Sequence, residues 1–419
     1  MKITFCAYDS PRQIGGPNTV LRRLLPALQQ AHPPRALLFK TESFAAGATV
    51  QALLRERVEV LQTVRPRSTE TMIHWILQQM AGGQSDVFVP DYVAPAYFAS
   101  RWLRPAGIVT IGAMHGDDPF YDALIDEFVI GRPEFRLDGL VCVSSFLERT
   151  VRQKIEPFAS GVQVRWIPPG MPLPPTTANP PADRLRIVYV GRLAETHKRS
   201  VDVARAMCRA ARAIPGVEGV LYGDGPSRRM VKHILATEGA GLPIRLAGSV
   251  DNDRIQAELL ASHALVLLSD SEGLSMAIME AMACGVVPIC LSVPSGALEL
   301  VEHNVTGLLV DDRDASFVGA VRRLREEPGL WQRLARAARH KIATVFTPER
   351  SAAQWLAFAE ELQQQVGPRR PVQIPARFEL PPVRPSLAHL DERELPFHHD
   401  TIKRARRALG YVRRRIRGG

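Results

Sequence analysis

Two glutamates stand eight residues apart: Glu272 lies in a short turn that contains glycine, and Glu280 lies about two helical turns further on. The turn is preceded by residues 265–269, a short apolar run that is typical of a buried parallel strand. It is followed by residues 276–284, which are strong helix formers, and by Gly285 at the position where helix ends favour glycine. The pattern therefore predicts a strand, a tight turn and a helix.

The predicted turn could bind a phosphate through its backbone. In open parallel sheets ligands bind at the C-terminal ends of the strands, and the free N–H groups of the following helix face the same crevice. A phosphate could rest on the amides of Gly273, Leu274 and Ser275, with a carboxylate on either side to accept hydroxyl protons. This arrangement suits a sugar nucleotide. The alternative is a solvated loop glutamate and a helix glutamate paired with an arginine, which is the commoner role for a lone pair of this kind.

The wider motif resembles the signature of glycosyltransferase family 4, a large retaining group with the two-domain GT-B fold. The likeness rests on Glu-Gly-Leu-Ser at 272–275, on Glu-Ala-Met-Ala-Cys-Gly at 280–285 and on a following Val-Val-Pro-Ile strand. Such a composite is more specific than a single glycine-rich loop. The resemblance implies that Glu272 holds the hydroxyls of the donor sugar and that Glu280 holds the ribose. It extends over about residues 1–366.

The resemblance implies an α/β protein of two Rossmann-like, doubly wound domains that face a central cleft. Residues 1–172 would form the N-terminal, acceptor-side domain, and the proline-rich residues 173–183 the linker. Residues 184–347 would form the domain that binds the nucleotide sugar, and a helix at 348–366 would cross back to the first domain.

Two cations in the second domain could neutralise a diphosphate. Arg192 ends a predicted strand, and Lys198 stands at the start of the next helix. Most surface arginines and lysines have no such role, but the resemblance implies that these two carry the β-phosphate as it leaves. It also implies that Gly223, in a Gly-Asp-Gly-Pro turn, and the backbone of Ser249 and Val250 lie beside the nucleotide.

The first domain supplies a glycine pair and a histidine. Gly15 and Gly16 lie between a strand and a helix, where glycine lets the backbone approach a ligand, although such pairs are often only turns. The resemblance places them where donor diphosphate and acceptor meet. His115 follows a strand end, and the resemblance implies that it contacts the donor sugar near the reacting carbon. Asp117 and Asp118 could bind acceptor hydroxyls or cap the next helix.

The composition is that of a soluble globular protein, with 46% apolar and 23% charged residues in 419. No stretch approaches the ~18 apolar residues of a spanning helix. The N-terminus reads as a first strand and lacks the longer apolar core of a signal peptide. The five scattered cysteines fit reduced, buried thiols in a cytoplasmic protein. Because protein cations would neutralise the leaving group, no metal and no cofactor are expected.

The positive charge gathers at the C-terminus. The net charge is +10, of which residues 399–419 carry +7. Residues 367–398 are rich in proline and should be an extended or disordered linker. Within residues 401–417 the apolar side chains follow helical spacing, which indicates a basic amphipathic helix. We favour an anionic membrane surface as its partner, since each Lys or Arg contributes about 1 kcal/mol there. The alternatives are nucleic acid and a solubilising tail that binds nothing.

These features favour a retaining glycosyltransferase that moves a sugar from a nucleotide-sugar donor to a glycan or lipid-linked acceptor in cell-envelope or extracellular polysaccharide biosynthesis. The protein would be cytoplasmic and peripheral at the inner face of the membrane. Another GT-B enzyme, such as a sugar-nucleotide epimerase or a phosphorylase, remains open. A nucleic-acid-binding protein is disfavoured, because the charge lies in the tail and no aromatic and basic platform is present. Removal of residues 367–419 should leave donor binding intact.

Overall fold

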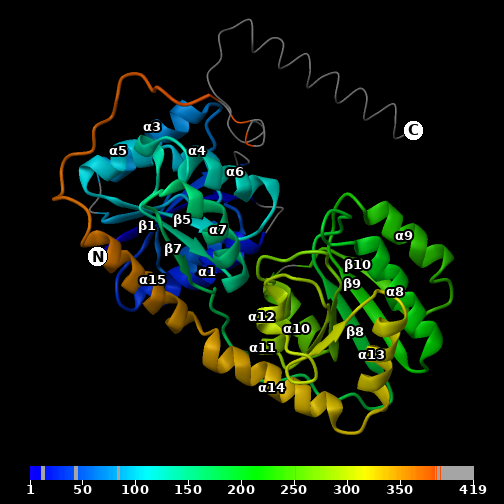
Figure 1. Cartoon of the computed structure of the whole chain (residues 1–419). Helices are drawn as coiled ribbons and strands as arrows, with labels where there is room; N and C mark the ends of the chain where they lie inside the picture. The colour runs from blue at the N-terminus through cyan, green and yellow to red at the C-terminus, as the bar shows by residue number, and fades with distance from the viewer. Residues whose placement is uncertain are drawn as a thin grey trace, which may run out of the picture.

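The structure is a computed structural model and describes residues 1–10, 15–41, 46–82, 85–250, 252–382, 384 and 387. It contains two parallel sheets, each covered by helices (Figure 1). The predicted basic helix at 401–417 lies outside the described residues.

The first sheet has seven parallel strands in the order β3-β2-β1-β4-β5-β6-β7. Its central strands are apolar and buried on both faces, as parallel strands between helix layers must be. The strands are β1 Ile3–Asp9, β2 Arg35–Lys40, β3 Glu59–Val64, β4 Val87–Val89, β5 Val109–Met114, β6 Gly139–Cys142 and β7 Gln163–Trp166. The helices are α1 Gly16–Gln29, α2 Ala48–Arg55, α3 Thr69–Ala81, α4 Ala94–Tyr97, α5 Ser100–Leu103, α6 Pro119–Phe128 and α7 Ser145–Ile155, with short 3₁₀ turns at Arg104–Ala106, Pro133–Phe135 and Glu156–Phe158.

The second sheet has six parallel strands in the order β10-β9-β8-β11-β12-β13. The strands are β8 Leu185–Val190, β9 Val217–Tyr222, β10 Ile244–Gly248, β11 Ala264–Leu267, β12 Val287–Leu291 and β13 Leu308–Val310. The helices are α8 Ser200–Ala213, α9 Arg228–Thr237, α10 Asn252–Leu260, α11 Met276–Ala283, α12 Ala297–Leu300, α13 Ala315–Glu326 and α14 Leu330–Val345. Two doubly wound parallel sheets confirm the predicted fold class.

The strand order of each sheet reverses beside its first strand, between β1 and β4 and between β8 and β11. At such a switch point the flanking loops turn to opposite faces of the sheet and leave a crevice for a ligand. The loops that follow β1, β4, β8 and β11 are therefore the expected ligand-binding loops. Three of them carry predicted site residues, and the loop after β4 carries none.

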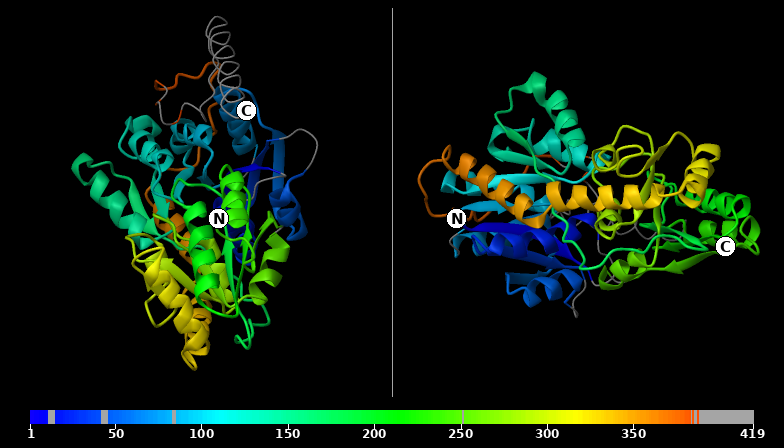
Figure 2. Two further views of the ribbon diagram at one scale, coloured as in Figure 1. Left: turned by 90° about the vertical axis from the view of Figure 1, so that its right-hand side faces the viewer. Right: turned by 90° about the horizontal axis from the view of Figure 1, so that it is seen from below.

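The last helix, α15 Pro348–Gln363, returns from the second domain to the first. Together with α14 it runs along one side of both domains (Figure 2). Its apolar face is buried in the core of the first domain, where Trp355 packs edge-on against Phe5 with ring centroids 5.5 Å apart. The two sheets are thus joined twice, by the linker and by this helix.

Beyond α15 the described chain has no further helix or strand, yet it packs closely on the first domain. The ring of Phe378 lies edge-on to Trp102 with centroids 5.0 Å apart, and Leu387 is only 2% exposed. Arg384 forms an ion pair with Glu127 of α6, whose side chain is 6% exposed. The first part of the predicted linker is therefore extended and also contributes to the first domain.

Candidate active site

The loops after β8 and β11 meet at an ion pair. Lys198 Nζ lies 2.6 Å from Glu272 Oε1, and the Glu272 side chain is only 11% exposed. His197 and Arg199, on either side of Lys198, both have positive φ, a conformation that non-glycine residues adopt at a cost of about 1–3 kcal/mol. Asp270 holds this bent loop, because its carboxylate accepts from Arg199 Nε at 2.6 Å and its N–H donates to the carbonyl of His197. The loop therefore presents Lys198 to Glu272.

The start of α11 offers unused donors beside this pair. Ser275 is the N-cap, and its hydroxyl accepts from the N–H of Ile278. Within the described part of the chain, the N–H groups of Gly273, Leu274 and Ser275 make no hydrogen bond. Free N–H groups at a helix N-terminus attract anions. The predicted phosphate position therefore has its donors available.

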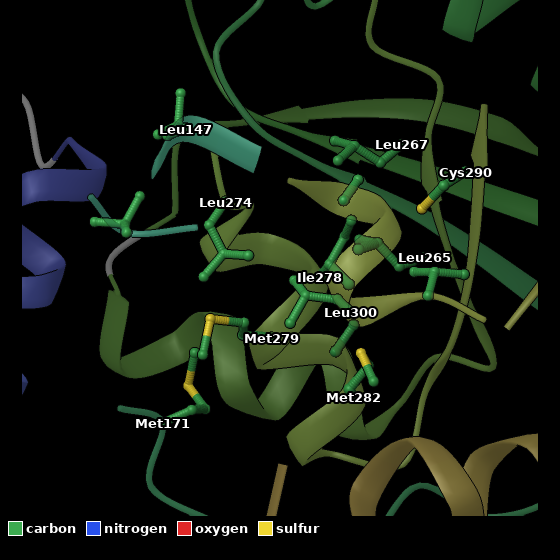
Figure 3. Packing of buried hydrophobic residues seen from close by; sticks show 14 of the residues in the cluster. Leu147, Met171, Leu265, Leu267, Leu274, Ile278, Met279, Met282, Cys290 and Leu300 are labelled. Carbon is green, nitrogen blue, oxygen red and sulfur yellow. The ribbon is translucent and has the colours of Figure 1, made fainter. Parts of the chain in front are cut away.

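Apolar packing fixes α11 in place. Ile278, Met279 and Met282 are fully buried, and Figure 3 shows the side chain of Met171 directed toward Met279. Leu147 of α7 in the first domain belongs to the same buried cluster. The helix that follows the free amides is therefore anchored by residues of the first domain, Leu147 and Met171, as well as by its own sheet.

Arg192 lies at the end of β8, where the structure leaves its side chain exposed. Its carbonyl accepts from Tyr189 Oη at 2.9 Å, and among the described residues its guanidinium has no partner. Burial, followed by the nearby charge of Glu272, raises the pKa of Tyr189, so this hydroxyl stays protonated and can donate. Arg192 is thus available to an anionic ligand.

The other predicted nucleotide contacts lie at the neighbouring strand ends. Gly223 has a φ of 145°, and a β-carbon there would lie 1.9 Å from the carbonyl oxygen of Gly191, so only glycine fits. Its N–H donates to the carbonyl of Gly248, which ends β10 and precedes Ser249 and Val250. The structure therefore aligns these loops along one edge of the sheet.

The first domain contributes His115, whose partner was not predicted from the sequence. Asp91 Oδ1 lies 2.6 Å from His115 Nε2, and both side chains are at most 10% exposed. Asp91 has a φ of 46° and its Oδ2 is buried without a hydrogen-bond partner in the described structure. Asp91 lies two residues after the end of β4, at the switch point, and this position was the signal that could have identified it.

The glycine pair lies at the start of α1. Gly15 is the N-cap with extended backbone, and Gly16 is the first residue of the helix. A β-carbon on Gly16 would lie 3.9 Å from Met276 Cγ, so the start of α1 faces the start of α11 across the domains. Neither glycine has a positive φ, and residues 11–14 lie outside the described part of the chain.

The two aspartates after His115 have different partners. Asp118 caps α6, because its carboxylate accepts from the N–H of Phe120 at 2.9 Å. Asp117 Oδ2 accepts from the hydroxyl of Ser271 at 2.6 Å, a contact between the two domains. Of the two roles considered for this pair, helix capping is thus found for Asp118.

Glu280 forms an ion pair with an arginine of the opposite domain. Arg23 Nη2 of α1 lies 2.6 Å from Glu280 Oε1, and the two side chains are 20% and 19% exposed. The sequence alternative of a helix glutamate paired with an arginine therefore describes Glu280 in this structure. Glu272 is likewise paired rather than solvated.

The chain is similar in sequence to known glycosyl transferases. Residues 177–341 match the model of the family described as glycosyl transferases group 1. The chain is 30% identical over 247 residues to glycogen synthase of Mycobacterium tuberculosis, a match that covers 56% of this chain and 58% of that protein. It is 32% identical over 186 residues to the amylovoran biosynthesis glycosyltransferase AmsK of Erwinia amylovora, over 42% of this chain and 45% of the relative. The chain thus spans about half the length of these relatives.

Solved structures extend the likeness to both domains. The HepE protein of Anabaena, solved in complex with UDP and glucose, superposes with a TM-score of 0.68 at 17% identity, over 86% of this chain and all of that one. The sucrose-phosphate synthase of Thermosynechococcus elongatus superposes with a TM-score of 0.67 at 18% identity, over 86% of this chain and 99% of that one. The chain therefore has the two-domain fold of the GT-B glycosyltransferases, and its residues 177–341 are similar to the group 1 glycosyl transferases.

Proposed function

We propose that the protein is a retaining glycosyltransferase of family 4 that transfers a sugar from a nucleotide-sugar donor to a glycan or lipid-linked acceptor. The observation that carries the proposal is the meeting of Lys198, Glu272 and the free amides of α11 beside the His115–Asp91 pair. Cations and amides suit a diphosphate, and carboxylates suit sugar hydroxyls.

In the proposed reaction the bond between the anomeric carbon and the β-phosphate oxygen breaks, and a bond to the acceptor oxygen forms on the same face. The acceptor proton leaves with the diphosphate. Arg192, Lys198 and the amides of residues 273–275 would stabilise the charge that develops on the leaving group. Electrostatic stabilisation of this kind usually lowers the activation barrier of an enzyme more than any other single effect. In this proposal protein cations take the role that a metal has in other transferases.

The first domain would hold the sugar from the opposite side. The Asp91 carboxylate would keep Nε2 of His115 protonated and its ring in one orientation, which leaves Nδ1 for the donor sugar or the acceptor. The Glu272 carboxylate would accept hydrogen bonds from sugar hydroxyls while it keeps its ion pair with Lys198. Closure of the domains would exclude water, so that transfer competes well with hydrolysis.

Polysaccharide or lipid-linked oligosaccharide assembly is the proposed setting. The relatives include AmsK and a colanic acid biosynthesis glycosyltransferase, WcaL, of Escherichia coli, 31% identical over 257 residues. No helix among the described residues is long and apolar enough to cross a membrane. The proposal places the protein in the cytoplasm at the inner membrane face, with residues 401–417 as the contact to anionic lipid.

A panel of radiolabelled UDP-, GDP- and ADP-sugars tests the proposal. Each is incubated with the protein, with and without glycan and lipid-linked acceptors, and the products are separated and their anomeric configuration is read by NMR. A glycoside that keeps the donor configuration supports the proposal. Free epimerised sugar nucleotide or a sugar phosphate as the sole product would instead indicate one of the other GT-B chemistries.

A further inference from the structure

Glu299 of α12 lies at the N-terminus of α7, in the opposite domain. Its Oε1 accepts from the N–H of Phe146 at 2.7 Å and from the hydroxyl of Ser145 at 3.0 Å, residues 153 and 154 positions away in sequence. Ser144, the N-cap of α7, accepts from the N–H of Leu147. The first N–H groups of a helix have no acceptor within the helix. Phe146 therefore takes its acceptor from the second domain.

The Glu299 carboxylate is turned into the interface between the domains. Its Oε2 is closed to solvent and has no hydrogen-bond partner among the described residues. The positive end of the α7 dipole favours a carboxylate at this place. Leu300, the next residue, and Leu147 of α7 belong to one buried cluster that crosses the domains (Figure 3). A polar contact and apolar packing thus both join α12 to the first domain.

The same short helix holds the backbone of Glu272. Gly296 is the N-cap of α12, and its N–H donates to the carbonyl of Glu272 at 2.8 Å. A β-carbon on Gly296 would lie 1.7 Å from the carbonyl oxygen of Gly273 and 3.1 Å from Cβ of Ser144. Gly296 therefore lies between the loop of Glu272 and the start of α7. A shift of α12 against α7 would move the Glu272–Gly273 backbone with it.

We propose that Glu299 is a positioning residue, which acts through Gly296 to hold Glu272 opposite His115 while the two domains are engaged. The inference rests on the proposed function, because that function gives Glu272 its role. Glu299 itself would contact neither donor nor acceptor. The diphosphate contacts at Arg192 and Lys198 belong to the second domain and do not pass through α7. Loss of Glu299 should therefore slow the reaction and leave nucleotide binding largely unchanged.

Kinetics and calorimetry of two variants test this separation. We expect kcat of Glu299→Ala, measured with the UDP-, GDP- or ADP-sugar that the wild type consumes, to fall by about 10–10², because a misplacement of about 1 Å at a reacting centre has an effect of that size. Glu299→Gln should recover most of the rate, since an amide oxygen accepts the same two hydrogen bonds. The affinity for UDP, GDP or ADP should stay close to the wild-type value in both variants.

Three results would overturn the inference. The first is a wild-type kcat in Glu299→Ala. The second is a Glu299→Gln variant as slow as Glu299→Ala, because the hydrogen bonds to α7 would then not be the cause. The third is a fall in nucleotide affinity as large as the fall in kcat, which would indicate a general disturbance of the second domain.

A double-mutant cycle tests whether Glu299 acts through α7. Ser145→Ala removes the hydroxyl partner and leaves the N–H of Phe146 in place, so it should lower kcat by less than Glu299→Ala does. Once Glu299 is gone, removal of the hydroxyl should cost little more, because residues that share one contact are not additive. Losses that multiply in full in the double variant would show that the two residues act independently, contrary to the inference.

Glu195→Ala is the matched control for the contact between the domains. Glu195 Oε1 accepts from the hydroxyl of Ser200 at 3.1 Å and from the N–H of Val201 at 3.0 Å, at the start of α8. It thus caps a helix in the same way, but within the second domain. Spin labels on Gln78→Cys and Lys232→Cys report the interdomain distance, because both positions are exposed and the five native cysteines are buried.

The distance measurement needs no nucleotide and so separates this inference from the proposed function. Glu299→Ala should broaden the distance distribution, and Glu195→Ala should not. An unchanged distribution in Glu299→Ala, or equal broadening in both variants, would contradict the inference. Failure of the wild type to bind any of the three nucleotides would instead contradict the proposed function.

Discussion

Gly273 lies so close to the backbone of His115 that a β-carbon on Gly273 would stand 2.1 Å from the His115 carbonyl oxygen. The contact joins the loop before α11 to the loop before α6, from opposite domains. Because the obstructing atom is backbone, it cannot turn aside as a side chain can. The glycine of the Glu-Gly-Leu-Ser motif is therefore required by the approach of the two domains.

Substitution of Gly273 by alanine should hold the two domains apart. Gly273 does not have a positive φ, so alanine should leave the second domain folded. We expect kcat/KM for the donor to fall by about 10² because a misplacement of about 1 Å at a reacting centre has that effect. Gly319→Ala in α13 is the control, since a β-carbon there meets nothing within 4 Å. Its activity should match the wild type, and equal losses in both variants would contradict this account.

Replacement of Lys198 by alanine should remove leaving-group stabilisation and leave Glu272 without its charge partner. We expect kcat to fall by about 10²–10³, the usual effect of losing one donor to a developing anion. Steady-state assays of donor consumption measure this. Lys154→Ala is a matched control, because Lys154 has the same 28% exposure and pairs with Asp122 at 2.7 Å, on α6. Comparable rates in the two variants would argue against a role for Lys198 in the reaction.

The segment after α15 should stabilise the first domain. Arg384→Ala leaves the buried carboxylate of Glu127 unpaired and should lower the free energy of unfolding by roughly 2 kcal/mol, less than for a fully buried pair because Arg384 is 40% exposed. Urea denaturation measures the change. A chain ending at residue 387 should keep wild-type stability and donor binding, whereas a chain ending at residue 366 should be destabilised. Equal stability of both truncated chains would show that the segment contributes nothing.

Because the segment after α15 packs on the first domain, the truncation that tests the basic tail should begin after residue 387 and not at residue 367. Removal of residues 367–419 would also remove Phe378 and Leu387 from the first domain, so a loss of donor binding would have two explanations. The cut after residue 387 isolates the basic tail. Loss of binding to anionic vesicles with unchanged donor affinity is the outcome expected from it.

His263 should make stability depend on pH. Burial, with a smaller effect of the Arg186 charge, lowers the pKa of His263 from its ordinary 6.5, against an opposing effect of Glu218. Its neutral Nδ1 accepts from the N–H of Arg186 at 2.8 Å. The unfolded chain therefore binds the proton at a higher pH than the folded protein does. The contribution of neutral His263 to the free energy of unfolding is complete above about pH 6.5, and it is lost as the pH falls toward the pKa of His263 in the folded protein.

Urea midpoints at about pH 7.5 and about pH 5.5 measure this effect. From about pH 7.5 to about pH 5.5, the urea midpoint of the wild type should decrease by more than the midpoint of His263→Gln, which lacks the titrating group. The other histidines titrate in both proteins and cancel in the comparison. Identical falls in the two proteins would mean that His263 is not linked to stability.

The sequence predicted the strand, turn and helix around Glu272 to within one or two residues, because local apolar pattern and helix propensity define them. It did not predict α2 or β3. The N-terminus of α2 is capped by Asp9, whose carboxylate accepts from the N–H of Gly47 at 2.6 Å, and no local pattern shows a cap 38 residues away. Strand β3 is an edge strand with a largely exposed face, so its residues lack a buried apolar run.

The paired site residues escaped prediction for the same reason. Sequence spacing placed Glu272 in a turn and Glu280 in the helix that follows, but it did not show their partners. Lys198 comes from the loop after β8, and Arg23 comes from α1 of the other domain. Asp91 reaches His115 only because β4 and β5 are neighbours in the sheet. The site residues within a single turn could be predicted from the sequence. The pairs formed between separate loops or between the two domains could not.

The most direct test measures how tightly the second domain binds a diphosphate. Calorimetric titration of UDP, GDP and ADP into the wild type, Arg192→Ala and Lys198→Ala compares affinities for the leaving group itself. We predict that the nucleotide bound by the wild type binds at least about tenfold more weakly to each variant, since each removes a charge-assisted contact to phosphate. Wild-type affinity in both variants would contradict the account.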